Sequence, residues 1–248
     1  MDVNEDLRDV ELADRLVRSY PALLSTEAVA MAWARAGAPS GAVVVADYQA
    51  SPRGRGGLPW KVTAGQGLGF TLVLRPELAP AREGWPYIPA LLALHDVVGR
   101  GGLIWPDEVH ARDGDVLARL GVYVELGPTR TEWVSVTVLV EYAEPPRADL
   151  LQRIVTAVDR RFALPPGQVL ADYVARCTTL GQAKRARLIP MGPGGPEVTG
   201  EAVDVLADGA LVLLTARGNR VAIPPHNLGL LEAPAEPAVI PDRLFGQR

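Results

Sequence analysis

Cysteine is almost absent from this chain, since Cys177 is the only one in 248 residues. A single cysteine excludes an internal disulfide, which is expected of a protein in a reducing cytoplasm. The three histidines, His95, His110 and His226, are scattered along the chain and lack the cysteine partners of a zinc site. We therefore expect no metal held by Cys and His, and we expect Cys177 to be a small buried residue.

Long apolar runs and an excess of positive charge are also missing. The longest apolar runs, such as 88–94, are far too short to cross a bilayer, and the acidic first six residues lack the apolar core of a secretory signal. The formal net charge of −4 does not provide the basic face that general nucleic-acid binding needs. We expect a cytoplasmic protein with no membrane and no nucleic-acid partner.

Two common catalytic motifs are absent from the sequence. It contains no Gly-x-x-x-x-Gly-Lys-Ser/Thr, so it is not a P-loop protein, and no Gly-x-Ser-x-Gly elbow of a serine hydrolase. What remains is an ordinary globular composition, 48% hydrophobic and 22% charged, and a length sufficient for one large domain or a large and a small one.

The hydrophobic pattern predicts an α+β fold. Helical periodicity is expected near 26–36, 86–98 and 148–163, and the leucines and valine in 6–18 also have near-helical spacing. Strands are expected at 42–47, 69–74, 120–126 and 132–140, the last alternating so that one face should be polar or less buried. Few strands are joined by helical crossovers, so we predict a mixed or largely antiparallel sheet.

A second unit is predicted after about residue 176. Four short strands fall near 186–189, 198–205, 210–214 and 220–223, and Asp208-Gly209 predicts a tight turn between two of them. A series of such short strands in under sixty residues is typical of a small SH3-like barrel. The expected organisation is therefore a domain over 1–175, a barrel over 176–232 and a loosely attached tail over 233–248.

The run Asp47-Tyr48-Gln49-Ala50-Ser51-Pro52-Arg53-Gly54-Arg55-Gly56-Gly57-Leu58-Pro59-Trp60 carries the strongest chemical signal. Its glycines let the backbone approach a ligand closely, and its two arginines offer forked donors suited to phosphate. Trp60 offers a flat face for a ring. This composition describes an anion-binding loop that could close over a nucleotide, although a solvated basic turn has the same composition.

Six segments in order make the chain resemble the biotin protein ligase family. The family has a Ser-Thr-Asn run, a Gln followed by a Gly-Arg-Gly-Arg loop and a Trp, a glycine-rich turn and strand, a Lys-Trp-Pro-Asn-Asp motif and a Gly-Ile-Leu-Val-Glu strand. The similar segments here are Ser25-Thr26-Glu27, Gln49 with 53–60, Gly65-Gln66-Gly67-Leu68-Gly69 with Leu74-Arg75-Pro76, Ile104-Trp105-Pro106-Asp107-Glu108, Gly121-Val122-Tyr123-Val124-Glu125, and Arg176-Cys177-Thr178-Thr179-Leu180-Gly181, which resembles the opening of the family's small C-terminal domain.

The resemblance implies a class II synthetase-like catalytic domain followed by the small barrel. It also implies an activity: joining biotin to ATP with Mg²⁺, then passing the biotinyl group from biotinyl-adenylate to a lysine of a carboxylase carrier domain. Dimerisation through an exposed sheet is a further implied property. A lipoyl or octanoyl group in place of biotin is an alternative that the sequence leaves open.

The resemblance also assigns residues to roles. Ser25, Thr26 and Gln49 would contact biotin, and Arg53, Gly54, Arg55 and Gly57 would close over the adenylate and its phosphates. Trp60 would face adenine, Trp105 and Pro106 would shape the pocket floor, and Glu108 would lie near ATP and its magnesium. Arg55 and Arg119 are the candidate catalytic cations.

Several family residues are replaced in this chain. Ile104 stands where the Trp-Pro motif opens with lysine, and Ala118, beside Arg119, stands where the family has its catalytic lysine. The family's Gly-x-Gly-x-Asn strand reads Ser135-Val136-Thr137-Val138-Leu139, Pro52 replaces a loop glycine, and Glu27 replaces an Asn. The loss of one placed charge typically costs about 10²–10³ in rate, unless Arg119 or Lys61 reaches the same phosphate.

Three hypotheses follow for the function. The first is an ATP-dependent biotin ligase with weak or altered activity, and the second is an inactive pseudo-ligase that binds biotin, a related acyl ligand or a partner protein. The third is an assembly protein that uses its sheet for dimerisation. The sequence alone leaves all three open.

Overall fold

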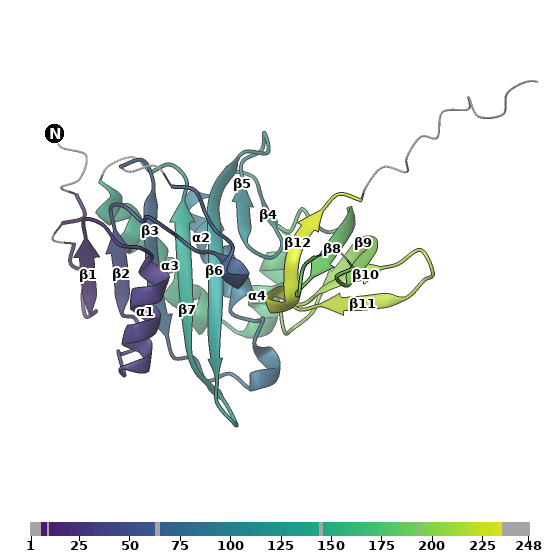
Figure 1. The fold of residues 1–248 in the computed structure, drawn as a ribbon, viewed down its shortest axis with the longest axis horizontal. Helices are drawn as coiled ribbons and strands as arrows, with labels where there is room; N and C mark the ends of the chain where they lie inside the picture. The colour runs from purple at the N-terminus through teal and green to yellow at the C-terminus, as the bar shows by residue number, and fades with distance from the viewer. Residues whose placement is uncertain (1–5, 9, 63–64, 144–145, 193, 235–248) are drawn as a thin grey trace, which may run out of the picture.

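The computed structural model describes residues 6–8, 10–62, 65–143, 146–192 and 194–234, which form two sheets with four α-helices (Figure 1). The larger sheet has seven strands in the order β1 (Val17–Tyr20), β2 (Val43–Ala46), β3 (Leu68–Leu74), β7 (Thr131–Val140), β6 (Val116–Leu126), β5 (Glu108–His110) and β4 (Gly102–Ile104). β1 and β2 run parallel, and every other neighbouring pair is antiparallel. The predicted α+β fold with a mixed sheet is confirmed.

Helices cover both faces of this sheet. α1 (Thr26–Arg35) lies across one face, while α2 (Tyr87–Val98) and α3 (Arg147–Ala163) lie behind the other (Figure 1). α4 (Pro166–Val174) follows α3 and leads toward the second sheet. No helix among the described residues is long and apolar enough to cross a membrane.

Small residues allow α1 to lie close to the sheet. Ala30 and Ala34, one turn apart, are buried and pack with Val44, Val73 and Trp133 of the strands beneath them. The spacing of four residues places both alanines on one side of the helix. The start of α1 is thereby fixed at the edge of the sheet where the candidate site lies.

α2 is apolar around most of its circumference. Its residues from Tyr87 to Leu94 are all buried, because the sheet covers one side of the helix and α3 covers the other. α3 is amphipathic and turns Leu151, Ile154, Val155 and Val158 inward. This layer closes the main hydrophobic core behind the sheet.

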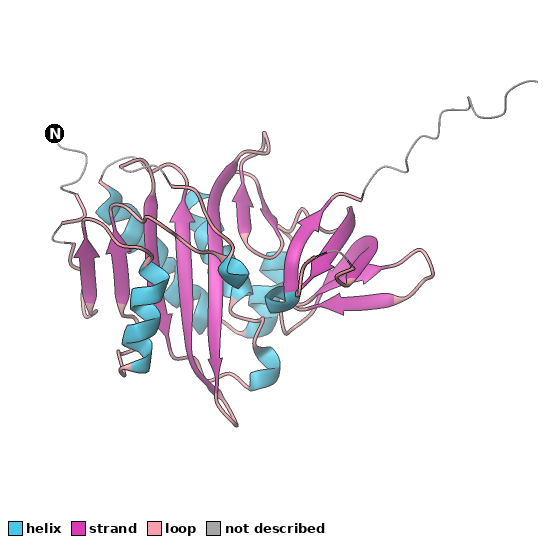
Figure 2. Ribbon diagram, in the orientation of Figure 1, coloured by secondary structure: helices cyan, strands magenta, loops and turns pink. Residues whose placement is uncertain are grey.

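The second sheet has five antiparallel strands in the order β11 (Arg220–Ile223), β10 (Leu211–Leu214), β9 (Glu197–Val205), β8 (Ala183–Leu188) and β12 (Leu228–Glu232). Between its described strands the only helical segment is the short turn η3 (Pro225–Asn227), and Figure 2 shows the longer helices gathered around the larger sheet. The Asp208-Gly209 turn between β9 and β10 is confirmed, with Gly209 at φ +90°. The division of the chain at residue 175 and the closure of a barrel stay predictions. Residues 235–248 of the predicted tail lie outside the described residues.

Three sequence expectations differ from the structure. Residues 10–16 form turns and loop rather than a helix, because Asp14 takes a φ of +58° and the chain then pairs as β1 with β2. The polar side of β7 is buried rather than exposed, because α1 covers part of it. Its Thr137 hydroxyl bonds Thr71, whereas the hydroxyls of Thr131 and Ser135 have no partner among the described residues. The short strands β4 and β5 and the helix α4 were not predicted, since such brief elements carry little periodic signal.

An ion-pair cluster ties the three helices behind the sheet together. Asp96 of α2 accepts hydrogen bonds from Arg161 Nε at 2.7 Å and from Arg160 at 2.8 Å, both on α3. Arg161 also donates to Asp172 of α4 at 2.6 Å. Burial raises the pKa of the Asp96 carboxyl, but the bonds from Arg161 and Arg160 outweigh it and leave that pKa below its ordinary value.

We predict that Asp96→Asn lowers the free energy of unfolding by about 2 kcal/mol near neutral pH, because it removes charge-assisted hydrogen bonds. A depressed pKa stabilises the fold above the ordinary value of 3.8 and loses that stabilisation as the pH falls through the folded pKa. The wild type should therefore lose more stability than the variant in that acidic range. Urea unfolding from pH 3 to 7 measures both effects, with Glu201→Gln on exposed β9 as the control. Parallel pH profiles for all three proteins would contradict the prediction.

Candidate functional site

A buried chain of hydroxyl groups crosses the face of the sheet next to α1. Thr137 on β7 donates to Thr71 on β3 at 3.0 Å, and Thr71 donates to Thr26 at 3.0 Å. Thr26 in turn donates to Gln49 Oε1 through its backbone N–H at 2.8 Å and through its hydroxyl at 3.0 Å. These bonds fix the Gln49 side chain, which is 4% exposed, and leave its amide N–H donors for another partner.

The connection between β1, α1 and β2 brings these residues together. Parallel β1 and β2 place the segments that follow them at the same end of the sheet, where Leu23 pairs with Gln49 in a parallel bridge. α1 begins just beyond Leu23, so its first turn lies beside Gln49. Two predicted ligand residues that are 23 positions apart in the sequence therefore meet directly.

Ser25, immediately before α1, has a buried hydroxyl without a partner. Its Oγ makes no hydrogen bond to any residue that the structure describes, and it does not cap the helix through its side chain. A buried hydroxyl without a hydrogen bond costs about 1–3 kcal/mol. Such a group, beside the fixed Gln49, is suited to bind a polar ligand atom.

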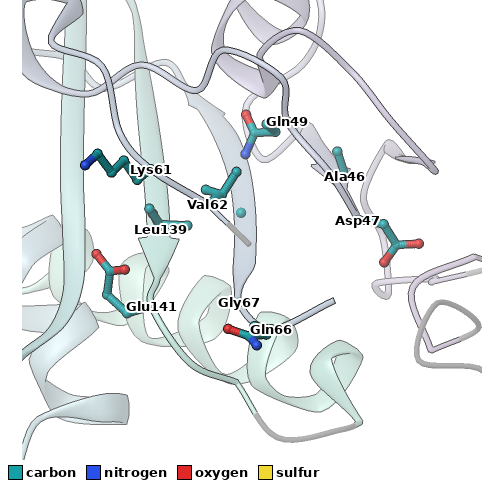
Figure 3. Close-up of a pocket in the computed structure, with 10 residues that line it drawn as sticks. Ala46, Asp47, Gln49, Lys61, Val62, Gln66, Gly67, Leu139 and Glu141 are labelled. Carbon is teal, nitrogen blue, oxygen red and sulfur yellow. The ribbon is translucent and has the colours of Figure 1, made fainter. Parts of the chain in front are cut away.

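A cavity of about 220 Å³ opens next to Gln49 (Figure 3). Lys61 and Glu141 lie at one end of it, and Asp47 lies at the opposite end. Its walls are formed by residues of β2, β3 and β7 and of the loop before β3: Ala46, Asp47, Gln49, Lys61, Val62, Gln66, Gly67, Gly69, Leu139 and Glu141. Small-molecule sites usually measure roughly 300–1,000 Å³, so a ligand of that class would require the loop to move outward.

Gly69 allows Gln49 to lie flat against β3. A Cβ atom at position 69 would come within 2.3 Å of Gln49 Nε2, which is closer than any ordinary contact. Gly69 therefore sets the position of the amide that faces the cavity. The glycine-rich stretch 65–69 thus has a steric role that its sequence did not specify.

The arginine–glycine loop lies against β6. A Cβ atom on Gly121 would meet the backbone of Gly54 and Arg55 at 3.0–3.1 Å, so a side chain there would push the loop back by a few tenths of an ångström. The loop is closed by a hydrogen bond from Gly54 N to Leu58 O at 2.8 Å, and the Trp60 ring packs on Gly54. The loop is therefore a folded structure rather than a freely solvated turn.

The two arginines of the loop have different surroundings. Arg55 is 6% exposed and donates to Asp107 Oδ2 at 2.9 Å, to the carbonyl of Leu228 and, at 3.5 Å, to that of Gly229. Arg53 is exposed and donates to the carbonyl of Gly57 at 3.0 Å. Arg55 thus joins the loop to the second sheet, whereas Arg53 stays at the surface.

Charged residues of β5 and β6 form a second network near the cavity. Arg119 donates to Glu108 Oε1 at 3.1 Å and is ion-paired with Glu141, and His110 Nε2 lies 2.8 Å from Glu108. Arg119 lies on the same side of β6 as Gly121, the side that faces the loop, because the two are separated by two residues. Arg119 therefore reaches a residue of the cavity wall, Glu141, although it does not line the cavity itself.

The predicted Trp-Pro segment belongs to the junction between the two sheets. Trp105 is buried and donates from Nε1 to Gly209 O at 2.9 Å, while its backbone N–H donates to Thr179 at 2.9 Å. Burial raises the pKa of the neighbouring Asp107, and the Arg55 charge opposes that rise. Trp105 and Pro106 do not line the cavity described here.

The predicted residues therefore fall into three places. Thr26 and Gln49 meet, with Ser25 beside them; Arg55 joins the Trp-Pro segment through Asp107; and Arg119 and Glu108 pair with each other. Sequence reasoning missed Thr71, Thr137 and the wall residues Asp47 and Glu141. The hydroxyl residues within otherwise apolar strands were the available signal, because buried polar side chains require partners.

A single methyl group at position 69 should disrupt this arrangement. Gly69→Ala forces the Gln49 amide away from β3 and weakens its two bonds to Thr26, so we expect a loss of about 1–2 kcal/mol in unfolding free energy. Gly167→Ala in α4 is the matched control, because a Cβ there meets nothing within 4 Å and a helical alanine is favourable. Urea denaturation measures both. A Gly69→Ala protein as stable as the wild type would show that Gln49 is not held as described.

Comparison with known proteins finds a relative that is similar to this chain over most of its length. The Biotin--[acetyl-CoA-carboxylase] ligase of Mycobacterium tuberculosis is 32% identical over 217 residues, covering 76% of this chain and 79% of that protein. No protein-family model matches the chain.

Solved structures show the same fold. The biotin protein ligase of Aquifex aeolicus, in complex with biotin and ATP, superposes with a TM-score of 0.62 at 19% identity, covering 88% of this chain and 99% of that one. The biotin acetyl coenzyme A carboxylase synthetase of Helicobacter pylori, with bound biotinylated ATP, gives 0.60 at 16% identity, with 84% and 100% covered. A biotin protein ligase-like protein of unknown function from Silicibacter gives 0.61 at 15%, with 88% and 97% covered.

Proposed function

This chain belongs to the biotin protein ligase family, and we propose that it activates biotin with ATP and transfers the biotinyl group to a lysine of a carboxylase carrier domain. One observation supports this proposal above others. Of the residues expected at the biotin site, Gln49 lines a cavity, Thr26 donates to its amide oxygen, and Ser25 next to Thr26 has a buried hydroxyl with no partner among the described residues. A lipoyl or octanoyl substrate is the variant of the proposal that the same site could accept.

The proposed reaction has two steps. A carboxylate oxygen of biotin attacks the α-phosphorus of ATP, and the bond to pyrophosphate breaks. The carrier amine then attacks the carbonyl carbon of biotinyl-adenylate, an amide forms, AMP leaves with the bonding electrons, and the amine loses a proton. Neither step needs a covalent bond to the protein, so its residues contribute positioning and electrostatic support.

The contacts at the cavity fit the biotin end of this reaction. Gln49 has free amide donors and Ser25 has a free hydroxyl, which suit the carbonyl and N–H groups of a ureido ring. The cavity is about 220 Å³, so binding of biotin and a nucleotide together requires the loop over 52–62 to open. In this proposal Arg53, Gly54 and Gly57 then close over the adenylate, with Trp60 facing adenine.

Two of the proposed catalytic groups already have partners. Arg55 is held by Asp107 and by carbonyls of the second sheet, so in the closed loop it positions the backbone of Gly54 rather than reaching into the cavity. Arg119 is paired with Glu108 and Glu141. We propose that Arg119 exchanges Glu141 for a phosphate when the nucleotide enters, because phosphate and carboxylate compete for the same forked donors.

The described residues do not fit a resident metal ion. No group of three or more His, Cys, Asp or Glu side chains gathers among them, and Glu108 is already bonded to Arg119 and His110. Mg²⁺ usually binds through one or two carboxylates together with substrate phosphates. We therefore expect Mg²⁺ to arrive with ATP, and no step above is assigned to it.

Incubation of the protein with biotin, ATP, Mg²⁺ and a biotin-acceptor domain tests the proposal. We expect the acceptor to gain the mass of one biotinyl group, with release of pyrophosphate and AMP. Parallel reactions with lipoate and octanoate identify the acyl group. Absence of both an acyl-adenylate and a modified acceptor in every reaction would end the proposal of ligase activity.

Removal of the polar contacts at the site should weaken biotin binding specifically. Gln49→Leu leaves a polar atom of biotin without its partner, and Thr26→Val leaves the Gln49 amide without the hydroxyl that fixes it. Each substitution should therefore raise the Kd for biotin by about tenfold or more. Calorimetry with biotin measures the change. Thr199→Val, on an exposed position of β9, is the control with the same chemical change. Equal affinities in all four proteins would contradict this placement of biotin.

The second candidate function is a pseudo-ligase that binds biotin without transferring it. Ile104 and Ala118 support it, since Ala118 is completely buried in the apolar core and offers no charge to a phosphate. This candidate predicts a measurable Kd for biotin with no formation of adenylate. Detectable turnover that is lost on substitution of Arg119→Ala would exclude it.

A further inference from the structure

The arginines around the cavity are already engaged. Arg55 is buried against Asp107 and two backbone carbonyls, and Arg119 is shared by Glu108 and Glu141. Arg147, which is completely buried, bonds Asp47 and Asp6 at 2.6 Å each. Each of these guanidinium groups would have to give up a carboxylate before it could bind a ligand anion.

The acidic residues of the cavity wall are the partners of two of those arginines. Asp47 at one end is ion-paired with Arg147, and Glu141 at the other end is ion-paired with Arg119. Each of these arginines lies outside the wall and also pairs with a second carboxylate, Asp6 for Arg147 and Glu108 for Arg119. The remaining charged residue of the wall is Lys61, which has no hydrogen bond or ion pair with any residue that the structure describes.

Lys61 is also unusual within the sequence. Only two of the 25 basic residues are lysines, Lys61 and Lys184, and all others are arginines. Lys184 lies on β8 in the second sheet, far along the chain from the cavity. The single lysine of the larger sheet and its loops is thus in the wall of the candidate site, next to Trp60 at the end of the arginine–glycine loop.

Resting on the proposed function, we propose that Lys61 is a further cation, in addition to Arg119, that contacts the phosphate of ATP and of biotinyl-adenylate. A nucleotide brings several negative charges into a cavity whose only cation in the wall, among the described residues, is this ammonium group, and it has no ion pair there. An ammonium is a compact charge on a flexible four-carbon stem, so Lys61 can follow the ligand when the loop moves. Lys61 lies on the loop before β3, at the same end of the cavity as Glu141, so its charge approaches from the loop rather than from a strand (Figure 3).

This assignment also accounts for the two lysines that the chain lacks. Ile104 lies on β4 away from the cavity lining, and the Ala118 side chain faces the apolar core. A cation restored at position 118 would have to be buried among apolar side chains, at high cost. Lys61 supplies a charge to the same cavity without burying it.

Calorimetry with ATP and Mg²⁺ on the full chain tests the assignment. We expect Lys61→Met to raise the Kd for ATP by about tenfold, the usual order for loss of one charge-assisted hydrogen bond. Lys61→Arg should restore most of the affinity, since it keeps the charge. Raising the ionic strength should weaken ATP binding to the wild type more than to Lys61→Met, because salt screens an exposed charge.

Lys184→Met is the matched control and should leave the Kd for ATP unchanged. Biotin alone should bind Lys61→Met as tightly as the wild type, so an equal loss of biotin and ATP affinity would overturn the assignment to phosphate. If the wild type binds ATP and forms adenylate while Lys61→Met does the same with unchanged Kd, this inference fails and the proposed function stands. If the wild type binds no ATP at all, both fail.

Discussion

The side chain of Gln49 is the point on which the candidate site depends. Its amide oxygen accepts two hydrogen bonds from Thr26 and so joins the end of β2 to the first turn of α1. Without that connection, the two segments would meet through backbone contacts alone, at Leu23 and Leu24. Because Thr26 accepts a hydrogen bond from Thr71, which is in turn bonded to Thr137, the amide is set by residues from two strands and a helix. A ligand thus meets a fixed donor, which lowers the entropy lost on binding.

The arginine–glycine loop is held by a different set of contacts. Gly121 lets the loop approach β6, and Arg55 fastens it to Asp107 and to the start of β12. The exposed Arg53 and Lys61 lie on either side of this fastened segment, so their side chains can move even when the loop is closed. Such a division separates residues that shape the loop from residues that are free to respond to a ligand.

Much of the fold could be predicted from the sequence, because long periodic segments such as 86–98 and 132–140 specify their own structure. The motifs also grouped Thr26 with Gln49, and the two residues are hydrogen-bonded to each other in the structure. The structure was needed for everything that depends on pairing between distant residues. No local pattern reveals that Arg55 is neutralised by Asp107, or that Asp47 is neutralised by Arg147, since those partners lie 52 and 100 positions apart. The burial of Ser135 and Thr137 was missed for a similar reason, because the covering helix is a distant part of the chain.

The junction between the two sheets determines whether the chain can be truncated. Leu211, Leu213 and Leu228 belong to the same apolar cluster as Leu103 and Val109 of the larger sheet, and Trp105 is fastened to Gly209 across the boundary. A fragment ending near residue 175 would expose the apolar residues of the larger sheet at this junction. It would also leave Arg55 without the carbonyls of Leu228 and Gly229. We expect such a fragment to aggregate, because an exposed apolar surface of this kind favours self-association. The small C-terminal sheet is therefore an integral part of the fold.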